Sequence, residues 1–211
     1  MMVGSETVVV IDFETTGRSP EQGARATEVA AVVVSNGAIV DRYQSLMNAG
    51  VPIPPFIETL TGISNRMIRQ APDAARVMIE LADFIGEIPL VAHNASFDAK
   101  FLQAELQRIG RPQRSKMLCS MRLARRIYPN APNHQLATLV RHARIAETGA
   151  YHRAMADAEM TAGLWLKMHA ELESSFNLPS VPLALLEQIQ RAPCNGLRAC
   201  VEAYRRSSSM Q

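Results

Sequence analysis

The stretch Val8–Gly17, VVVIDFETTG, decides the fold and raises the first question about function. Consecutive β-branched apolar residues predict a strand buried on both faces of a sheet, from Thr7 to Phe13. Alternate side chains of a strand leave the same face, so Asp12 and Glu14 point the same way. The strand therefore ends by placing two carboxylates side by side.

Asp12 and Glu14 have two possible explanations. Two carboxylates repel each other, and a hard divalent cation with oxygen ligands would remove the cost of burying them together. The sequence Asp-x-Glu-Thr-Thr-Gly can also form a hydrogen-bonded turn at the end of a strand. The pair alone leaves both explanations open.

Residues 27–48 predict the next two strands, because two apolar runs flank the dipeptide Asn36-Gly37. This dipeptide favours the positive φ angles of a tight hairpin turn, so we expect the first three strands to form an antiparallel meander. Residues 89–95, PLVAHNA, predict a short strand that leads into a helix over residues 96–110. A strand that feeds a helix indicates a parallel crossover. We expect Ser96 to be the N-cap of that helix and Gly110 to end it.

Four further segments in the first 174 residues of the chain have helical patterns. We expect an amphipathic helix over residues 71–86 and mainly helical segments at residues 117–128, 135–146 and 153–174. Two more helical stretches follow, at residues 183–192 and 195–211. The sequence therefore predicts a mixed α/β domain over residues 1–173 and a helical C-terminal extension over residues 174–211.

The composition fits a compact globular protein, with 47% hydrophobic and 20% charged residues in 211. No apolar run approaches the roughly 20 residues needed to cross a bilayer, and the N-terminal MMVGSET has no Lys or Arg. We therefore expect no membrane association and a cytoplasmic location. Cys119, Cys194 and Cys200 show no zinc-site spacing and are expected to be reduced.

A basic zone lies between Glu105 and Glu147, where the chain has no acidic residue. Its cations are Arg108, Arg111, Arg114, Lys116, Arg122, Arg125, Arg126, Arg141 and Arg144. A zone of one sign suits a polyanion, and the preference for Arg suits bidentate contacts to phosphate. For any single residue, a solvated helix face is an equal alternative.

Two more acids occur in settings that resemble the first pair. Asp98 follows the strand at residues 89–95 and lies in the first turn of the next helix, where it can also serve the helix dipole. Asp157 heads the series Thr161, Leu164 and Met168, so it shares the apolar stripe that should face the sheet. An acid on such a stripe is unusual without a partner.

His152 precedes Asp157 by five residues, which on a continuous helix would place the two side chains roughly 140° apart. They can converge only if His152 lies in the preceding loop or first turn. There the positive end of the helix favours a neutral imidazole, the form that accepts a proton. We interpret the remaining histidines as surface or capping residues: His93, His134, His142 and His169.

Three motifs, taken together, resemble those of a known family. DFETTG at residues 12–17, HNASFDAKFL at residues 93–102 and HRAMADAEMT at residues 152–161 are similar, in order and spacing, to the motifs of the DEDDh exonucleases. This family includes the proofreading epsilon subunit of bacterial DNA polymerase III. The resemblance covers about residues 6–172 and includes LTGIS at residues 60–64.

The resemblance implies a fold and an activity. The fold is ribonuclease H-like, a five-stranded mixed sheet of three antiparallel strands followed by two parallel ones, flanked by helices. The activity is 3′–5′ hydrolysis of phosphodiester bonds in DNA or RNA, with release of nucleoside 5′-monophosphates. Two divalent cations, Mg²⁺ or Mn²⁺, serve this reaction in a two-metal-ion mechanism.

The resemblance also assigns roles to residues. Asp12, Glu14 and Asp157 would hold one ion, Asp12 would bind the second as well, and Asp98 would reach the second largely through water. His152 would be the general base. Positions that contact the terminal base and sugar in the family correspond to Thr15, Leu60, Thr61, Ile63 and Phe97. Core packing is an equal alternative for Leu60, Ile63 and Phe97.

The expected partners are single-stranded or frayed 3′ ends of DNA or RNA, and the sequence does not distinguish the two sugars. A homodimer is possible because several family members are dimers. We expect no polymerase or sliding-clamp partner, because the tail from Ser174 contains no clamp-binding pentapeptide.

Two other functions share part of this pattern. A nucleic-acid-binding module without activity would have the same fold, but all five chemical residues of the family are present. A haloacid-dehalogenase-like phosphatase would need Asp at position 14 and an Asp-Asp or Gly-Asp metal motif, and the chain has Glu14 and neither motif.

Overall fold

The structure, a computed structural model, describes residues 6–112, 115–149 and 151–208. Arg114 of the basic zone and most of the MMVGSET segment lie outside these ranges. The described residues form one five-stranded sheet with the strand order β3-β2-β1-β4-β5. Its strands are β1 (Val8–Thr15), β2 (Ala26–Ser35), β3 (Ala38–Leu46), β4 (Leu90–Ala92) and β5 (Met117–Cys119).

The pairing of the strands confirms the predicted sheet. β1 pairs antiparallel with β2 and β2 with β3, whereas β4 runs parallel to both β1 and β5. Asn36 and Gly37 form the turn between β2 and β3, and both have the expected positive φ, 51° and 77°. Three antiparallel strands are therefore followed by two parallel ones, as in ribonuclease H-like proteins.

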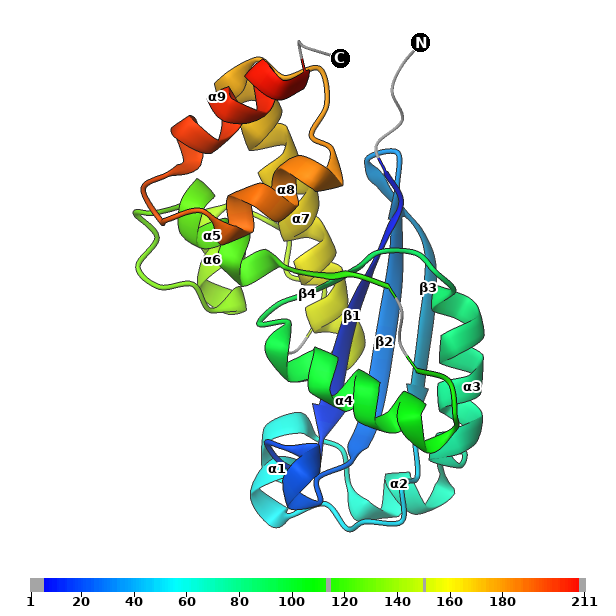
Figure 1. The fold of residues 1–211 in the computed structure, drawn as a ribbon. Helices are drawn as coiled ribbons and strands as arrows, with labels where there is room; N and C mark the ends of the chain where they lie inside the picture. The colour runs from blue at the N-terminus through cyan, green and yellow to red at the C-terminus, as the bar shows by residue number, and fades with distance from the viewer. Residues whose placement is uncertain (1–5, 113–114, 150, 209–211) are drawn as a thin grey trace.

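Helices cover both faces of the sheet and one end of it (Figure 1). The first group is the 3₁₀ turn η1 (Pro20–Gln22), α1 (Pro55–Thr61), α2 (Asn65–Gln70), α3 (Ala74–Ile85) and α4 (Ser96–Arg108). The second group is α5 (Ser120–Ile127), α6 (Leu136–His142), α7 (Ala154–Phe176), α8 (Leu183–Arg191) and α9 (Leu197–Ser208). No helix in the described ranges has both the length and the apolar character needed to cross a membrane.

The alternation of β1 divides the core into two layers. Val8 and Val10 pack in a cluster with residues of α5, α7 and α8, whereas Val9, Ile11 and Phe13 pack in a cluster with α3 and α4. Figure 1 shows α4 on one face of the sheet and α7 on the other. Both helices are therefore anchored by apolar residues on either side of the strand that carries Asp12.

Three local expectations were wrong. Met117–Cys119 is a strand rather than part of a helix, because it pairs with β4 at the edge of the sheet. A run of only three apolar residues has no periodicity that could have separated the two possibilities. Ser96 is the first helical residue of α4 and does not cap it. The helix expected over residues 71–86 begins at Ala74, because the Asp73 carboxylate caps it by accepting a hydrogen bond from the Ala75 amide at 2.8 Å.

The C-terminal helices pack on the same core as the sheet. Leu185, Leu186, Ile189 and Val201 are fully buried and belong to the cluster that contains Val8. The predicted boundary at residue 173 falls within α7, three residues before its last residue, Phe176. The division into a domain of residues 1–173 and a helical extension stays a prediction.

Candidate active site

The four predicted acids come from three elements that meet at the end of the sheet where β1 finishes. Asp12 and Glu14 lie near the end of β1, Asp98 lies in the first turn of α4, and Asp157 lies in the first turn of α7. Because β4 runs parallel to β1, the helix that follows β4 begins at the same end of the sheet at which β1 finishes. All four acids line one cavity of about 450 Å³, together with His152.

The distances support a single constellation. One ligand atom each from Glu14, His152 and Asp157 lie within 4.8 Å of one another. The Asp98 Oδ1 atom accepts a hydrogen bond from the backbone amide of Phe13 at 3.2 Å, which ties α4 to the strand between the two acids of β1. The structure therefore brings together the residues that the sequence had placed far apart in the chain.

The four carboxylates destabilise one another. Burial raises the pKa of Asp12 well above its usual value, and the charges of Asp98, Asp157 and Glu14 raise it further. Burial, followed by the charge of Asp157, raises the pKa of Glu14 to about 8. Burial also raises the pKa of Asp98 to about 8, although the bond from the Phe13 amide opposes the shift. The charge of Arg153 opposes the shift of the Glu14 pKa only in part, so the four acids leave a net demand for positive charge.

One oxygen of Asp157 shows where a cation would fit. Its Oδ2 atom accepts a hydrogen bond from the backbone amide of His152 at 2.9 Å, whereas its Oδ1 atom is buried and has no partner among the described residues. Burial raises the pKa of Asp157, and the bond from His152 opposes that effect. An orphaned carboxylate oxygen beside other acids is a suitable ligand for a hard divalent cation.

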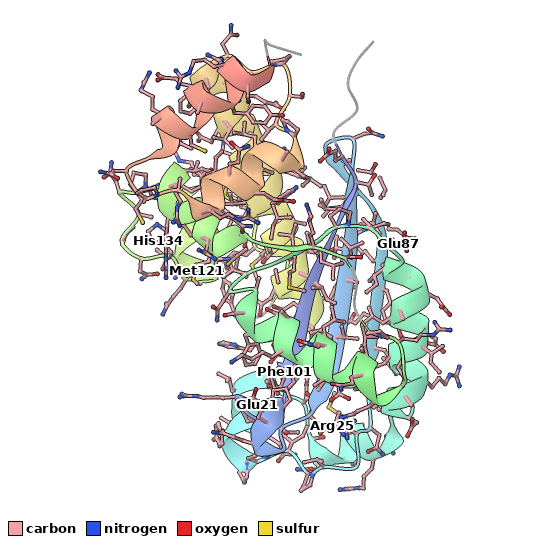
Figure 2. All side chains as sticks on the ribbon, in the orientation of Figure 1. Glu21, Arg25, Glu87, Phe101, Met121 and His134 are labelled. Atoms are coloured by element: carbon pink, nitrogen blue, oxygen red, sulfur yellow. The ribbon has the colours of Figure 1, made fainter. Side chains whose placement is uncertain are left out.

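Two other buried acids show how a carboxylate is stabilised without a metal. Glu105 in α4 binds the guanidinium of Arg25 through both oxygens, at 2.7 and 2.8 Å, and also accepts the Ala26 amide (Arg25 is labelled in Figure 2). Glu28 in β2 accepts hydrogen bonds from Arg153, from Gln44 and from the backbone amide of Ala154. Both acids are saturated, in contrast to the four that line the cavity.

Glu28 is a residue of the site that the sequence analysis missed. It lies directly opposite Glu14 in the sheet and is fully buried. Its bonds to Arg153 and Ala154 hold the first residues of α7, and thereby position His152 and Asp157. The available signal was an acid in the long apolar run of β2, at a position where the strand alternation predicts burial.

His152 lies in the loop before α7, as predicted. Its side chain is exposed, and its backbone has a φ of 63°, in the left-handed region. This conformation turns the chain so that the His152 amide donates to Asp157. The imidazole and the carboxylate therefore meet although they are five residues apart.

The interpretation of the other histidines was wrong for His93 and His169. His93 lines the cavity, with Nδ1 at 2.9 Å from the Ser120 hydroxyl and Nε2 at 3.0 Å from the His134 carbonyl oxygen. His169 packs against Trp165, with ring centres 4.8 Å apart. Burial lowers the pKa of each to about 4. Sequence spacing does not reveal such tertiary neighbours.

The predicted substrate positions divide into two groups. Thr15, Leu60, Thr61 and Phe97 line the cavity of the acids. Ile63 does not, because it is fully buried in a small cluster with Ile53, Ile57 and Ile68. For Ile63 the structure therefore shows the alternative, core packing.

An exposed apolar pair forms part of the cavity wall. Phe56 and Leu60 are one helical turn apart on α1, and they are 67% and 49% exposed. Both line the cavity, on the α1 side of it. The sequence analysis did not identify Phe56, because a single aromatic residue that follows several prolines has no distinguishing pattern.

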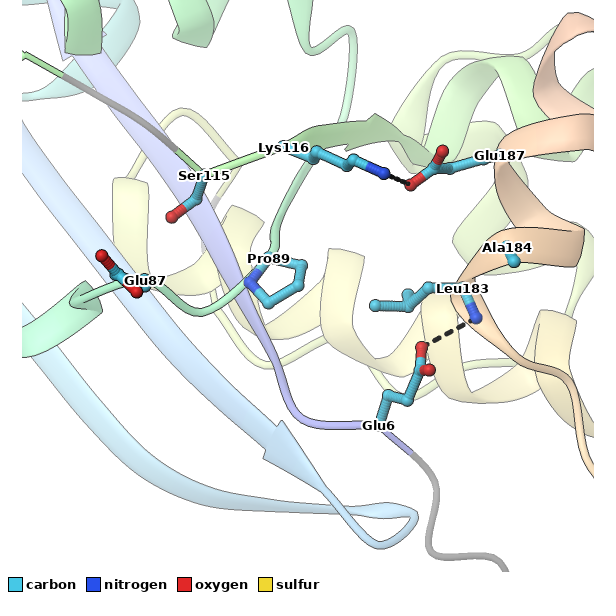
Figure 3. Close-up of a pocket in the computed structure, with 8 residues that line it drawn as sticks. All are labelled: Glu6, Glu87, Pro89, Ser115, Lys116, Leu183, Ala184 and Glu187. Atoms are coloured by element: carbon cyan, nitrogen blue, oxygen red, sulfur yellow. Dashed lines mark hydrogen bonds and ion pairs between the residues drawn. The ribbon is translucent and has the colours of Figure 1, made fainter.

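A cavity of about 560 Å³ lies away from the acids, between the start of β1, β4, β5 and α8 (Figure 3). Three of its four charged groups have partners, since Lys116 pairs with Glu187 at 2.9 Å and Glu6 accepts the Leu183 amide at 2.8 Å, and Glu87 is the fourth. It contains no convergent group of unpaired acids. The chemistry therefore belongs to the cavity at the end of β1.

Comparison with known sequences agrees with this geometry. The profile of a family described as "Exonuclease" matches residues 9–165. The PolC-type DNA polymerase III of Bacillus subtilis is 39% identical over 169 residues, which is 79% of this chain and 12% of the relative. The DNA polymerase III subunit epsilon of Aquifex aeolicus is 34% identical over 167 residues, which is 79% of this chain and 82% of the relative.

Solved structures with the same fold are also nucleases. Exonuclease X, determined in complex with 5′ overhanging duplex DNA, has a TM-score of 0.65 and 26% identity, and the match covers 80% of this chain and 93% of that one. Escherichia coli exonuclease I in complex with a dA16 oligonucleotide has a TM-score of 0.71 over 82% of this chain. At 17% identity, the second likeness concerns the fold alone.

Proposed function

This chain belongs to the exonuclease family, and from that premise we propose that it is a metal-dependent 3′–5′ exonuclease that acts on DNA or RNA. It spans only 12% of the PolC-type relative, so the activity is argued from the site. The observation that carries the proposal is the convergence of Asp12, Glu14, Asp98 and Asp157 in one cavity, where none of the four forms an ion pair with a described residue.

We assign the metal ligands to those four acids. The orphaned oxygen of Asp157 and the mutual repulsion of the carboxylates fit two hard divalent cations, Mg²⁺ or Mn²⁺. When bound, such ions stabilise negative charge on phosphate oxygens and lower the pKa of water. Glu28 and Glu105 are excluded as ligands because their oxygens already accept other hydrogen bonds.

His152 is assigned as the general base. Its exposed imidazole stands at the mouth of the cavity, beside Glu14 and Asp157. It accepts a proton from the water that attacks the phosphorus atom, the bond from phosphorus to the 3′-oxygen of the preceding nucleotide breaks, that oxygen takes a proton from solvent, and the terminal nucleoside 5′-monophosphate is released. The bond from the His152 amide to Asp157 keeps the residue in place during this step.

The terminal nucleoside has apolar surfaces available to it. Leu60 and Phe97 provide apolar area in the cavity wall, and Thr15 and Thr61 lie beside the acids. The hydroxyl of Thr61 donates to the Ile57 carbonyl at 2.9 Å and that of Thr15 to the Gly17 carbonyl at 2.7 Å. We therefore assign these two threonines to shaping the pocket around the sugar, with Ile63 supporting it from within.

The decisive experiment measures degradation of DNA and RNA oligonucleotides labelled at the 3′ or the 5′ end, in Mg²⁺, Mn²⁺ or EDTA. We expect immediate release of a labelled mononucleotide from the 3′-labelled strand and a ladder from the 5′-labelled strand, both abolished by EDTA. The matched control is Asp157→Asn, which removes a ligand charge and keeps the side-chain volume. Binding without hydrolysis would instead support a nucleic-acid-binding module without activity.

The partners are proposed with the activity. Single-stranded or frayed 3′ ends fit an open cavity lined by apolar side chains and acids. Two relatives are named as DNA polymerase III proteins, which favours a polymerase as a partner over our expectation from the tail. A cytoplasmic location is part of the same proposal. Sedimentation equilibrium tests for a homodimer, and co-purification with a polymerase tests the association.

A further inference from the structure

The cavity of the acids continues beyond the terminal-nucleotide pocket. A second cavity of about 550 Å³ shares Asp12, His93 and Asn94 with the first, and shares His152 and Asp157 as well. A third cavity of about 460 Å³ shares Asn94 and Met121 with the second. Met121 is labelled in Figure 2, on α5. We call these three neighbouring cavities, which share lining residues in succession, the groove.

The far end of the groove has the opposite charge to its beginning. Arg122 and Arg125 of α5 line the third cavity, and none of the described residues that line it is acidic. The other lining side chains are small, apolar or neutral, such as Ser96, Met121 and Gln190. The groove therefore runs from a cluster of acids to a pair of guanidinium groups.

These two arginines differ from several other cations of the basic zone. Several cations of that zone already have partners: Arg108 pairs with Glu105, Arg111 with Asp83 and Lys116 with Glu187, and Arg126 donates to the Ala192 carbonyl. Within the described part of the chain, neither Arg122 nor Arg125 pairs with a carboxylate. The side chain of Arg125 only approaches the Met121 sulfur, at 3.8 Å. Both guanidinium groups are free to bind an anion.

We propose that Arg122 and Arg125 form a second phosphate-binding subsite, which holds the sugar-phosphate backbone of the substrate strand on the 5′ side of the nucleotide being removed. The proposal rests on the proposed function. A strand that places its 3′ end among the acids must leave the site, and the groove offers it a path without further negative charge. Arginine pairs at helical spacing suit phosphate oxygens because each guanidinium presents several donors in one plane.

This subsite makes no sequence-specific demand. Backbone contacts position a strand and contribute electrostatic affinity without reading bases. The subsite would therefore act on substrates long enough to reach α5, and its contribution would fall with salt. A dinucleotide fills the acid cavity only and gains nothing from Arg122 or Arg125.

The experiment compares Arg122→Ala/Arg125→Ala with Arg66→Ala/Arg69→Ala. The control pair lies on α2, is exposed, has the same spacing and charge, and lines none of the three cavities. Figure 1 shows α2 and α5 far apart. The substrates are single-stranded homopolymers, either oligothymidylate or oligouridylate, whichever type the enzyme cleaves. Their lengths run from two to about twelve nucleotides, within the usual range of single-strand binding sites.

We expect kcat/KM of the wild type and of the α2 variant to increase with substrate length. On the longest substrate, kcat/KM of the α5 variant should be about tenfold lower than that of the wild type, because its KM is higher. The slope of log kcat/KM against log salt should become shallower by about 1.4 for two lost phosphate contacts. Equal length and salt dependence in the two double variants would overturn the subsite. Failure of the wild type to cleave any oligonucleotide would instead refute the proposed exonuclease activity.

Discussion

The buried carboxylates of this protein differ in whether hydrogen-bond donors from the protein already bind their oxygens. Glu28 and Glu105 accept several hydrogen bonds and pair with arginine, whereas Asp157 keeps a buried oxygen without a partner. The strand and helix positions of Asp12 and Asp157 could be read from sequence, because period and motif spacing depend on near neighbours. The partners of Glu28 could not, because they come from β3 and α7.

At the residue scale, Asp12→Asn should stabilise the metal-free protein and inactivate it. The change removes one of several buried like charges, so we expect the free energy of unfolding in EDTA to rise by about 1 to 2 kcal/mol. Hydrolysis should fall by more than about a hundredfold because a metal ligand is lost. Urea unfolding in EDTA and a single-turnover assay measure the two effects. A metal-free variant less stable than wild type would contradict the charge-repulsion argument.

His169 makes the stability depend on pH. Its pKa of about 4 lies below the value of an exposed histidine, so the unfolded chain binds more protons between about pH 4 and 6.5. The free energy of unfolding therefore falls as the pH drops through this window. We expect His169→Phe to remove this destabilising effect and to raise the free energy of unfolding near pH 5 by about 2 kcal/mol relative to wild type. At pH 7.5, where the histidine is neutral in both states, the variant should change this free energy little. Urea midpoints of both proteins at the two pH values decide this.

At the scale of elements, the start of α7 is the part of the site most dependent on distant contacts. Arg153 and Ala154 bind Glu28 of β2, and a second ion pair joins Arg42 of β3 to Glu159 of α7. The helix itself could be predicted from its apolar stripe, and so could the place of His152 before it. The short strand β5 could not, because pairing with β4 rather than local pattern defines it.

The two ion pairs at α7 provide a matched comparison. Glu28→Gln removes the fully buried carboxylate that Arg153 and the Ala154 amide bind, and because the Arg153 side chain is 38% exposed we expect a loss of about 2 kcal/mol. It should also lower kcat, because His152 and Asp157 lose their positioning. Arg42→Ala breaks an exposed pair on the same helix and should cost less than about 1 kcal/mol. Thermal unfolding and oligonucleotide hydrolysis test both variants. Equal losses would show that Glu28 has no special role.

At the scale of the whole molecule, the helical tail is part of the packing of the sheet. α8 and α9 contribute Leu185, Leu186, Ile189 and Val201 to the cluster beneath β1. The fold of residues 1–173 and the helical nature of the tail could be predicted from periodicity and motif order. The docking of the tail could not, because an amphipathic helix shows that it needs a partner and not which partner.

Leu186→Ala tests that packing without touching the site. Leu186 is fully buried, so we expect a loss of about 3 kcal/mol in the free energy of unfolding. Turnover at low temperature should be unchanged, since none of the cavities along the groove includes this residue. Urea unfolding and initial rates provide the measurements. A stability change below about 1 kcal/mol would indicate that α8 does not belong to the folding unit of the sheet.

The left-handed backbone at His152 gives this position two independent requirements. One is geometric: asparagine and glycine adopt such a φ readily, whereas β-branched residues do not. The other is chemical, since the general base that we propose for this position needs an imidazole that can accept a proton. A library randomised at codon 152 would consequently be enriched in different residues at this position, depending on the screen. A solubility screen would enrich asparagine and glycine, and a screen for nucleotide release would recover histidine alone.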